Sequence, residues 1–197
     1  MLKIIGTFLL IGLMNTSAVA SDIKLPQPDK SNKTTLIQAL EKRQSSREFS
    51  DEVIDNETLS TILWAAYGVN RPDGKRTIPT AKGEKDLYVY VFNQSGVFLY
   101  DADLNALKMI SQENHLDLFN KQDYMDSVST VLVYTGGDND YSALHAGSAY
   151  QSVELYASAN DMACIVRGFF DYEKVSEVLD LPKEQRVIVS QAIGWKK

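Results

Sequence analysis

A twenty-residue stretch rich in small side chains constrains this fold more than any other part of the sequence. Residues 141–160 are expected to form one long helix. Short side chains allow neighbouring elements to approach a helix closely, so this helix is predicted to be central. Its small residues are Ala143, Ala146, Gly147, Ser148, Ala149, Ala157, Ser158 and Ala159.

Three further helices are predicted from their start and stop signals. Thr35-x-x-Gln38 is a capping box, in which a hydroxyl and an amide satisfy two free helix donors, and the helix after it is expected to end near Arg43. A second helix begins at Asp55 and stops at Gly68, and another covers 171–179. The apolar residues of the first helix line one face: Leu36, Ile37 and Leu40.

Strands are predicted where aromatic and β-branched residues cluster. Residues 87–92 and 97–100 form a hairpin around the turn at 93–96, and 130–135 is a buried strand. The last strand is 187–193. Residues 70–85 are expected to form a loop, with short helices at 104–110 and 121–128. Helices interleaved with antiparallel strands indicate an α+β fold.

The composition is that of one folded domain. Of 197 residues, 44% are hydrophobic and 23% charged, which excludes a disordered chain. With 20 Lys+Arg against 26 Asp+Glu, the formal charge is −6, so a basic nucleic-acid binder is not expected. A single cysteine excludes a disulfide within the chain.

The first twenty residues resemble a secretory signal peptide. Lys3 precedes an apolar run at 4–14, and Ala18-Val19-Ala20 offers a cleavage site. The run is shorter than the roughly 20 residues that a membrane span requires, so no stable membrane anchor is expected. We expect a chain exported to the periplasm or medium and cleaved near Ala20, with an extended leader at 21–33 and a single domain at 34–197.

The common catalytic constellations are missing from the sequence. Cys164 lies in an apolar run, which favours a buried, inert thiol. His115 and His145 match no tight metal-ligand spacing with Asp138 or Asp140, so no metal site is expected. No nucleophile elbow, P-loop or dinucleotide-binding glycine motif is present.

The segment Arg43-Gln44-Ser45-Ser46-Arg47 is the most informative local motif. Two cations four residues apart, with hydroxyls between them, make a compact site for an anion such as phosphate. The alternative is an ordinary helix end, where cations are favoured by the helix dipole. Spacing alone leaves both interpretations open.

Several larger pieces, taken in order, resemble the nitroreductase superfamily. The similar segments are 43–49, 63–68, 76–81, 146–171 and 189–194. Leu-Trp-Ala-Ala-Tyr-Gly at 63–68 and Arg-Thr-Ile-Pro-Thr-Ala at 76–81 are closest to the dehydrogenase-like branch that includes SagB-type proteins. The resemblance covers nearly all of the chain after the leader.

The resemblance implies a central, mostly antiparallel sheet flanked by helices, and a homodimer that binds FMN at the subunit interface. Arg43, Gln44 and Ser45 would hold the phosphate or ribityl chain, and either Lys196 or Lys197 could add a cation. Arg47 would lie near the pyrimidine edge of the flavin ring, where a fixed cation favours the reduced form.

Two other segments would complete the cofactor site. The resemblance implies that Pro79, Thr80 and Ala81 come from the partner subunit and cover the ring. Arg167 and Gly168 would present backbone N–H groups near N5, the atom that takes and gives hydride. Because a flavin carries the reaction itself, no catalytic side chain is required.

The resemblance implies an FMN-dependent oxidoreductase acting on a small conjugated molecule, such as a nitro compound or a quinone, with an unknown electron donor. The signal peptide adds that this enzyme is exported. The alternative is a non-catalytic secreted protein that keeps the fold and binds a small molecule. Lys82-Gly83-Glu84-Lys85, where the family has Asn and Gln, favours that alternative, whereas Arg43, Ser45 and Arg47 favour the enzyme.

Overall fold

The computed structural model describes residues 22–197. The predicted signal peptide, 1–20, lies outside this range. No helix within 22–197 combines the length and apolar character needed to cross a membrane.

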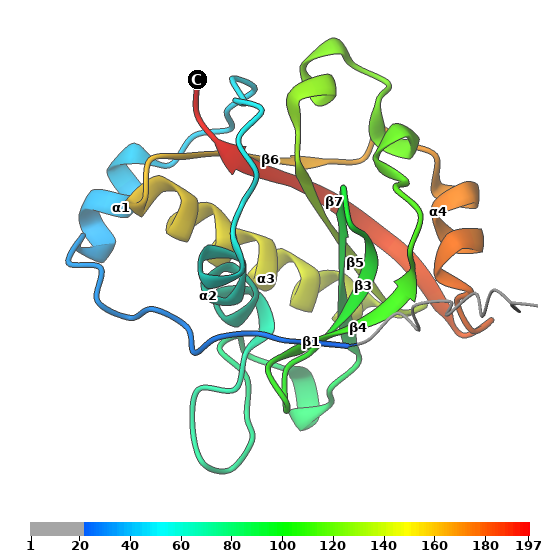
Figure 1. Ribbon diagram of the computed structural model, residues 1–197. Coiled ribbons are helices and arrows are strands. Elements are labelled where there is room, and N and C mark those ends of the chain that lie inside the picture. The colour runs from blue at the N-terminus through cyan, green and yellow to red at the C-terminus, as the bar shows by residue number, and fades with distance from the viewer. Residues whose placement is uncertain (1–21) are drawn as a thin grey trace, which may run out of the picture.

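A seven-stranded sheet runs through the middle of the domain (Figure 1). Its strand order is β1-β4-β3-β2-β5-β7-β6, and every neighbouring pair is antiparallel. The predicted α+β class is therefore confirmed. The strands are β1 (Ile23–Lys24), β2 (Leu87–Asn93), β3 (Gly96–Asp101), β4 (Ala106–Ser111), β5 (Thr130–Gly137), β6 (Met162–Arg167) and β7 (Gln185–Trp195).

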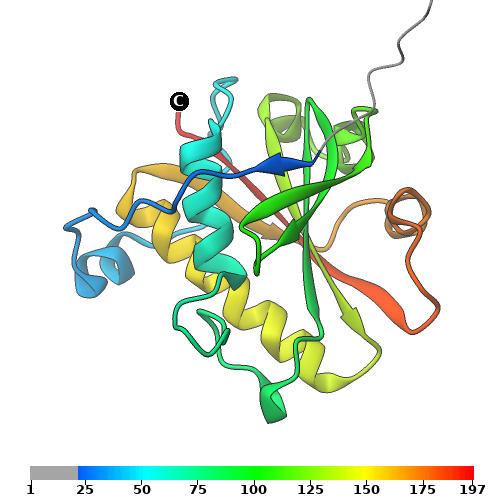
Figure 2. The same ribbon diagram turned by 60° about the horizontal axis from the view of Figure 1, so that its bottom comes forward.

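Helices cover both faces of this sheet. Two of them, α2 and α3, pack on one face, while α4 and two short 3₁₀ turns pack on the other (Figures 1 and 2). The helices are α1 (Leu36–Lys42), α2 (Asn56–Tyr67), α3 (Asp140–Ala159) and α4 (Tyr172–Leu179), and the 3₁₀ turns are η1 (Ala81–Gly83), η2 (Leu116–Phe119) and η3 (Asp123–Ser127). The predicted long helix is thus confirmed as α3.

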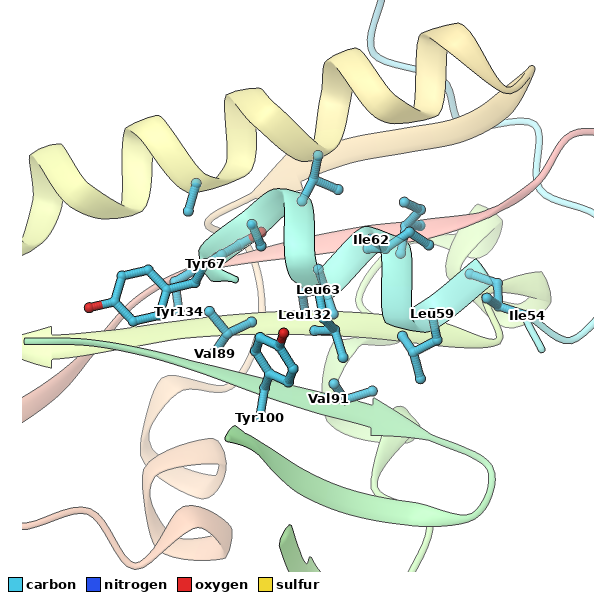
Figure 3. Packing of buried hydrophobic residues seen from close by; sticks show 14 of the residues in the cluster. Ile54, Leu59, Ile62, Leu63, Tyr67, Val89, Val91, Tyr100, Leu132 and Tyr134 are labelled. Carbon is cyan, nitrogen blue, oxygen red and sulfur yellow. The ribbon is translucent and has the colours of Figure 1, made fainter. Parts of the chain in front are cut away.

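The two faces of the sheet have separate hydrophobic cores. Along β2, Val89 and Val91 face α2 and α3, whereas Tyr90 and Phe92 face the other core. This alternation follows from the two-residue repeat of a strand. Figure 3 shows the side chains of α2 packed between α3 and the strands.

Both ends of α2 follow from local sequence, as predicted. The side chain of Asp55 accepts a hydrogen bond from the Thr58 N–H at 2.7 Å. At the other end, a Cβ on Gly68 would lie 2.3 Å from the Trp64 ring. Gly68 has φ −69°, so the close approach to Trp64, rather than a left-handed conformation, requires glycine there.

Two predictions of local structure were wrong or incomplete. Residues 104–110 were expected to be helical, but β4 occupies Ala106–Ser111 and pairs with β3, with Tyr100 opposite Leu107. The hydrogen bonds of that pairing override the local preference. The apolar run after residue 161 forms β6, a strand that the sequence analysis did not identify.

The capping box of α1 is confirmed, but its apolar face lies outside the core. Leu36, Ile37 and Leu40 are 64%, 63% and 47% exposed, and Ala39 is the buried residue of the helix. α1 lies at the side of the domain, beside the C-terminal half of α3 (Figures 1 and 2). The side of α1 that faces away from α3 is therefore exposed to solvent.

Candidate functional site

The segment after α1 is held in an extended conformation across β6 and β7. The Ser46 N–H donates to the Cys164 carbonyl in β6 at 2.9 Å, and the Ser50 N–H donates to the Trp195 carbonyl in β7 at 2.9 Å. Phe49 also forms an isolated antiparallel β-bridge with Lys196. These bonds fix the backbone that carries Arg43, Gln44, Ser45 and Arg47.

One cleft brings together three of the predicted site residues. It has a volume of about 320 Å³ and lies where α1 ends, beside the last turn of α3 and the end of β7. Arg43, Gln44 and Lys196 all line it. A guanidinium, an amide and an ammonium are donors suited to a phosphate. The remaining lining residues are Glu41, Lys42, Ser158 and Asp161.

Two of the cations in this cleft already have carboxylate partners. Arg43 Nη1 lies 2.9 Å from Glu154 Oε2, and the Glu154 side chain is only 8% exposed. Lys196 Nζ lies 2.6 Å from Asp161 Oδ1, and the hydrogen bond from Lys196 lowers the pKa of Asp161. The donor set fits a phosphate, and a bound anion would share these cations with their carboxylates.

Arg47 and Arg167 form a second group, around the ring of Tyr124. Their guanidinium carbons lie 5.7 Å and 5.5 Å from its centroid. Ser45 is exposed on the strip that leads from the cleft to this group. Because an extended chain advances at most about 3.6 Å per residue, Arg43 and Arg47 are no more than roughly 14 Å apart along it.

The side chain of Arg167 is buried and bonds to the chain around it. Nη1 donates to the Phe119 carbonyl at 3.1 Å, while Nη2 donates to Gln122 Oε1 at 3.1 Å and to the Phe169 carbonyl at 3.0 Å. Gly168, the next residue, is exposed. The guanidinium therefore fixes the turn after β6, at the point where the sequence analysis expected backbone donors.

The predicted flavin loop lies elsewhere in the same chain. The Ala81 N–H donates to His145 Nε2 in the first half of α3 at 2.8 Å. Arg43 contacts α3 nine residues later, at Glu154. At 1.5 Å per residue these points on the helix are about 14 Å apart. The structure therefore does not bring Pro79, Thr80 and Ala81 to the cleft of Arg43 within one chain.

The buried thiol agrees with the inert cysteine expected from sequence. Cys164 is buried, and that burial raises the pKa of its thiol. Within residues 22–197, no three His, Cys, Asp or Glu side chains converge as metal ligands. His145 pairs with Asp86, whereas Asp138 forms an ion pair with Arg186.

Sequence reasoning missed residues that contact the predicted segments in space although they lie far from them in the sequence. Glu154 lies 111 residues from Arg43, and Asp86 lies 59 residues from His145. A carboxylate among the small and apolar residues of α3 was the one local signal for Glu154. No local pattern marks Tyr124 or Asp86.

Comparison with known proteins agrees with this fold. The model of the nitroreductase family matches residues 40–195. A nitroreductase homologue of Methanocaldococcus jannaschii is 27% identical over 181 residues, which cover 81% of this chain and 90% of the relative.

Solved structures give the same result. A nitroreductase homologue from Ralstonia eutropha has a TM-score of 0.83 at 29% identity, covering 89% of this chain and 90% of that chain. Another, from Anabaena variabilis, has a TM-score of 0.74 at 21% identity and covers 90% of this chain and 42% of that chain, which shows the fold alone. The SagB-type branch stays a prediction. Family members are generally flavin-dependent oxidoreductases, and this chain belongs to the nitroreductase family.

Proposed function

We propose that this protein is an exported, homodimeric, FMN-dependent oxidoreductase. It would transfer a hydride, or two electrons, to or from a small conjugated organic molecule such as a nitro compound or a quinone. The observation that carries the proposal is the convergence of Arg43, Gln44 and Lys196 on one cleft, from separate parts of a nitroreductase-family chain.

The proposal gives the predicted residues of this region the following roles. Arg43, Gln44 and Lys196 would bind the phosphate, and Ser45 would reach the ribityl chain. Arg47 would place positive charge beside the ring, where it stabilises negative charge on reduction. The backbone at Gly168 would donate to the ring. Bound FMN would supply the two-electron chemistry.

A second copy of the chain is proposed to complete the site. The exposed apolar residues of α1 offer a surface for a homodimer. Leu144, near the start of α3, is a separate exposed apolar residue, at 65% exposure. Pro79, Thr80 and Ala81 lie away from the cleft of their own chain, so they are available to cover the ring bound by the partner subunit.

Export follows from the predicted signal peptide and belongs to the same proposal. A chain that leaves the cytoplasm unfolded must acquire FMN outside it, where NAD(P)H is scarce. The electron donor is therefore proposed to be a reductant other than free NAD(P)H.

The alternative, a non-catalytic binding protein, has one structural observation in its favour. Arg43 and Lys196 are each engaged by a carboxylate, Glu154 and Asp161. If those pairs persist when FMN is supplied, the cleft does not bind phosphate and the fold serves another ligand.

The test is to purify the chain from residue 21 onward and measure its flavin content. We expect flavin absorbance bands and the release of FMN on heating, or tight uptake of added FMN. Reduced protein should then pass electrons to a quinone. Binding of FMN without turnover would favour the alternative, and no binding of FMN would refute the proposal.

A further inference from the structure

His145 is a buried histidine with both ring nitrogens engaged. Nδ1 lies 2.6 Å from Asp86 Oδ1, and Nε2 lies 2.8 Å from the backbone nitrogen of Ala81. The other carboxylate oxygen of Asp86 accepts a hydrogen bond from the Ser142 hydroxyl at 2.8 Å. His145 itself is 4% exposed. A buried polar group with every hydrogen bond made is well fixed in orientation.

The backbone contact determines which ring nitrogen carries the proton. A backbone N–H can only donate, so Nε2 of His145 must be the acceptor and cannot carry a proton. The proton is then on Nδ1 and is donated to Asp86. Burial raises the pKa of Asp86, but the hydrogen bonds from Ser142 and His145 outweigh this effect, and the net result is a lowered pKa. Asp86 is therefore held as a carboxylate acceptor.

These three residues are not a hydrolytic triad. In such a triad the serine hydroxyl donates to the histidine nitrogen that takes its proton. Here the Ser142 hydroxyl donates to Asp86, and the free lone pair of His145 points at Ala81. The arrangement therefore binds a backbone N–H instead of activating a nucleophile.

The loop that donates this hydrogen bond needs an external contact to keep its shape. Lys82 has φ 54° and Gly83 has φ 75°, so two consecutive residues occupy the left-handed region. A lysine is disfavoured there and stays only when its surroundings fix the backbone. Among residues 22–197, the bond from Ala81 to His145 is the only hydrogen bond that joins residues 79–84 to the rest of the chain.

We propose that His145, oriented by Asp86, is a positioning residue that holds the loop 79–83 in place. The part of this inference that concerns catalysis rests on the proposed function, in which the loop covers the flavin ring. The anchoring itself requires no flavin. Both can therefore be tested separately on the same protein.

The experiment compares two substitutions of His145 in the flavin-free chain. His145→Gln keeps an acceptor at the position of Nε2, while His145→Leu removes it at similar volume. Since one hydrogen bond changes an equilibrium by about three- to tenfold, the Ala81 amide should exchange about three- to tenfold faster in His145→Leu. His145→Gln should restore exchange to within about twofold of the wild type.

Trypsin cleavage after Lys82 gives a second measurement of the same loop. Lys82 is exposed, so release of the loop should raise cleavage there relative to cleavage after Lys108 in β4. The ratio separates a local release from global unfolding, which would raise both. His115→Leu, at the other histidine, is the matched control and should leave the ratio unchanged.

Nitrogen NMR of the imidazole tests the premise directly. The wild type should show a neutral His145 with its proton on Nδ1. A proton on Nε2, or equal protection of Ala81 in His145→Leu and the wild type, would overturn the proposal. If the loop is released in His145→Leu and FMN affinity does not fall, the anchor stands and the placement of the loop over the flavin is wrong.

Discussion

The ion pair between Arg43 and Glu154 joins the proposed phosphate ligand to the core of the domain. The two atoms lie 2.9 Å apart, with the arginine side chain 36% exposed and the glutamate 8% exposed. Removing one partner of a buried pair costs about 3–5 kcal/mol, whereas an exposed pair contributes about 0–1 kcal/mol. With one buried and one partly exposed member, Arg43→Ala should lower the free energy of unfolding by about 2 kcal/mol.

A double-mutant cycle isolates that contribution. Glu154→Gln removes the buried charge, so adding it to Arg43→Ala should recover about 1–2 kcal/mol of the loss. Urea denaturation of the flavin-free chain measures the free energy of unfolding of all four proteins. In thermal denaturation, the Tm of Arg43→Ala should be about 4–8 °C lower than that of the wild type. If the two single changes add to within about 0.3 kcal/mol, the pair does not form in solution and this reasoning is wrong.

The same variants separate stability from ligand binding. If Arg43 also binds the phosphate, Arg43→Ala should weaken FMN about ten- to hundredfold, with much less effect on riboflavin, which lacks the phosphate. Glu154→Gln keeps the guanidinium and should retain FMN binding. Isothermal titration with both ligands measures the difference. Equal losses for FMN and riboflavin would leave Arg43 with a structural role alone.

Three further predictions test the dimer, the end of α2 and the acid response. Ile37→Lys should convert a dimer to a monomer in light scattering, whereas Leu104→Lys, at a similarly exposed leucine of the β3–β4 turn, should not; a dimer that survives Ile37→Lys excludes the α1 surface. Gly68→Ala places a Cβ 2.3 Å from the tryptophan ring in α2 and should cost about 1–3 kcal/mol in urea denaturation, whereas Gly147→Ala, with its nearest neighbour at 3.7 Å, should be neutral or stabilising. A hydrogen bond from a lysine of β4 chiefly holds the pKa of Asp101 below its ordinary value of 3.8. The ionised Asp101 therefore stabilises the fold fully above pH 3.8, and this stabilisation is lost as the pH falls through the lowered pKa. Asp101→Asn should therefore lower stability at neutral pH and lose this effect in acid, and a difference that grows in acid would contradict the assignment.

Much of the candidate site was visible in the sequence because its residues are neighbours in the chain. Arg43, Gln44, Ser45 and Arg47 form one extended strip, whose motif could be identified without any tertiary contact. Their separation into two groups could not be predicted, because it depends on which distant side chains meet each arginine. Glu154 engages Arg43, while Tyr124 lies beside Arg47.

Local sequence determined the helices, since caps and stop signals act over a few residues. Asp55 and Gly68 set the limits of α2 in just this way. Tertiary structure alone decided that residues 106–111 pair as a strand and that the apolar face of α1 lies outside the core. It also placed Asp86 beside His145 and thereby fixed the loop at Ala81. Backbone pairing and burial depend on contacts between segments far apart in the chain, and no local pattern specifies which segments will meet.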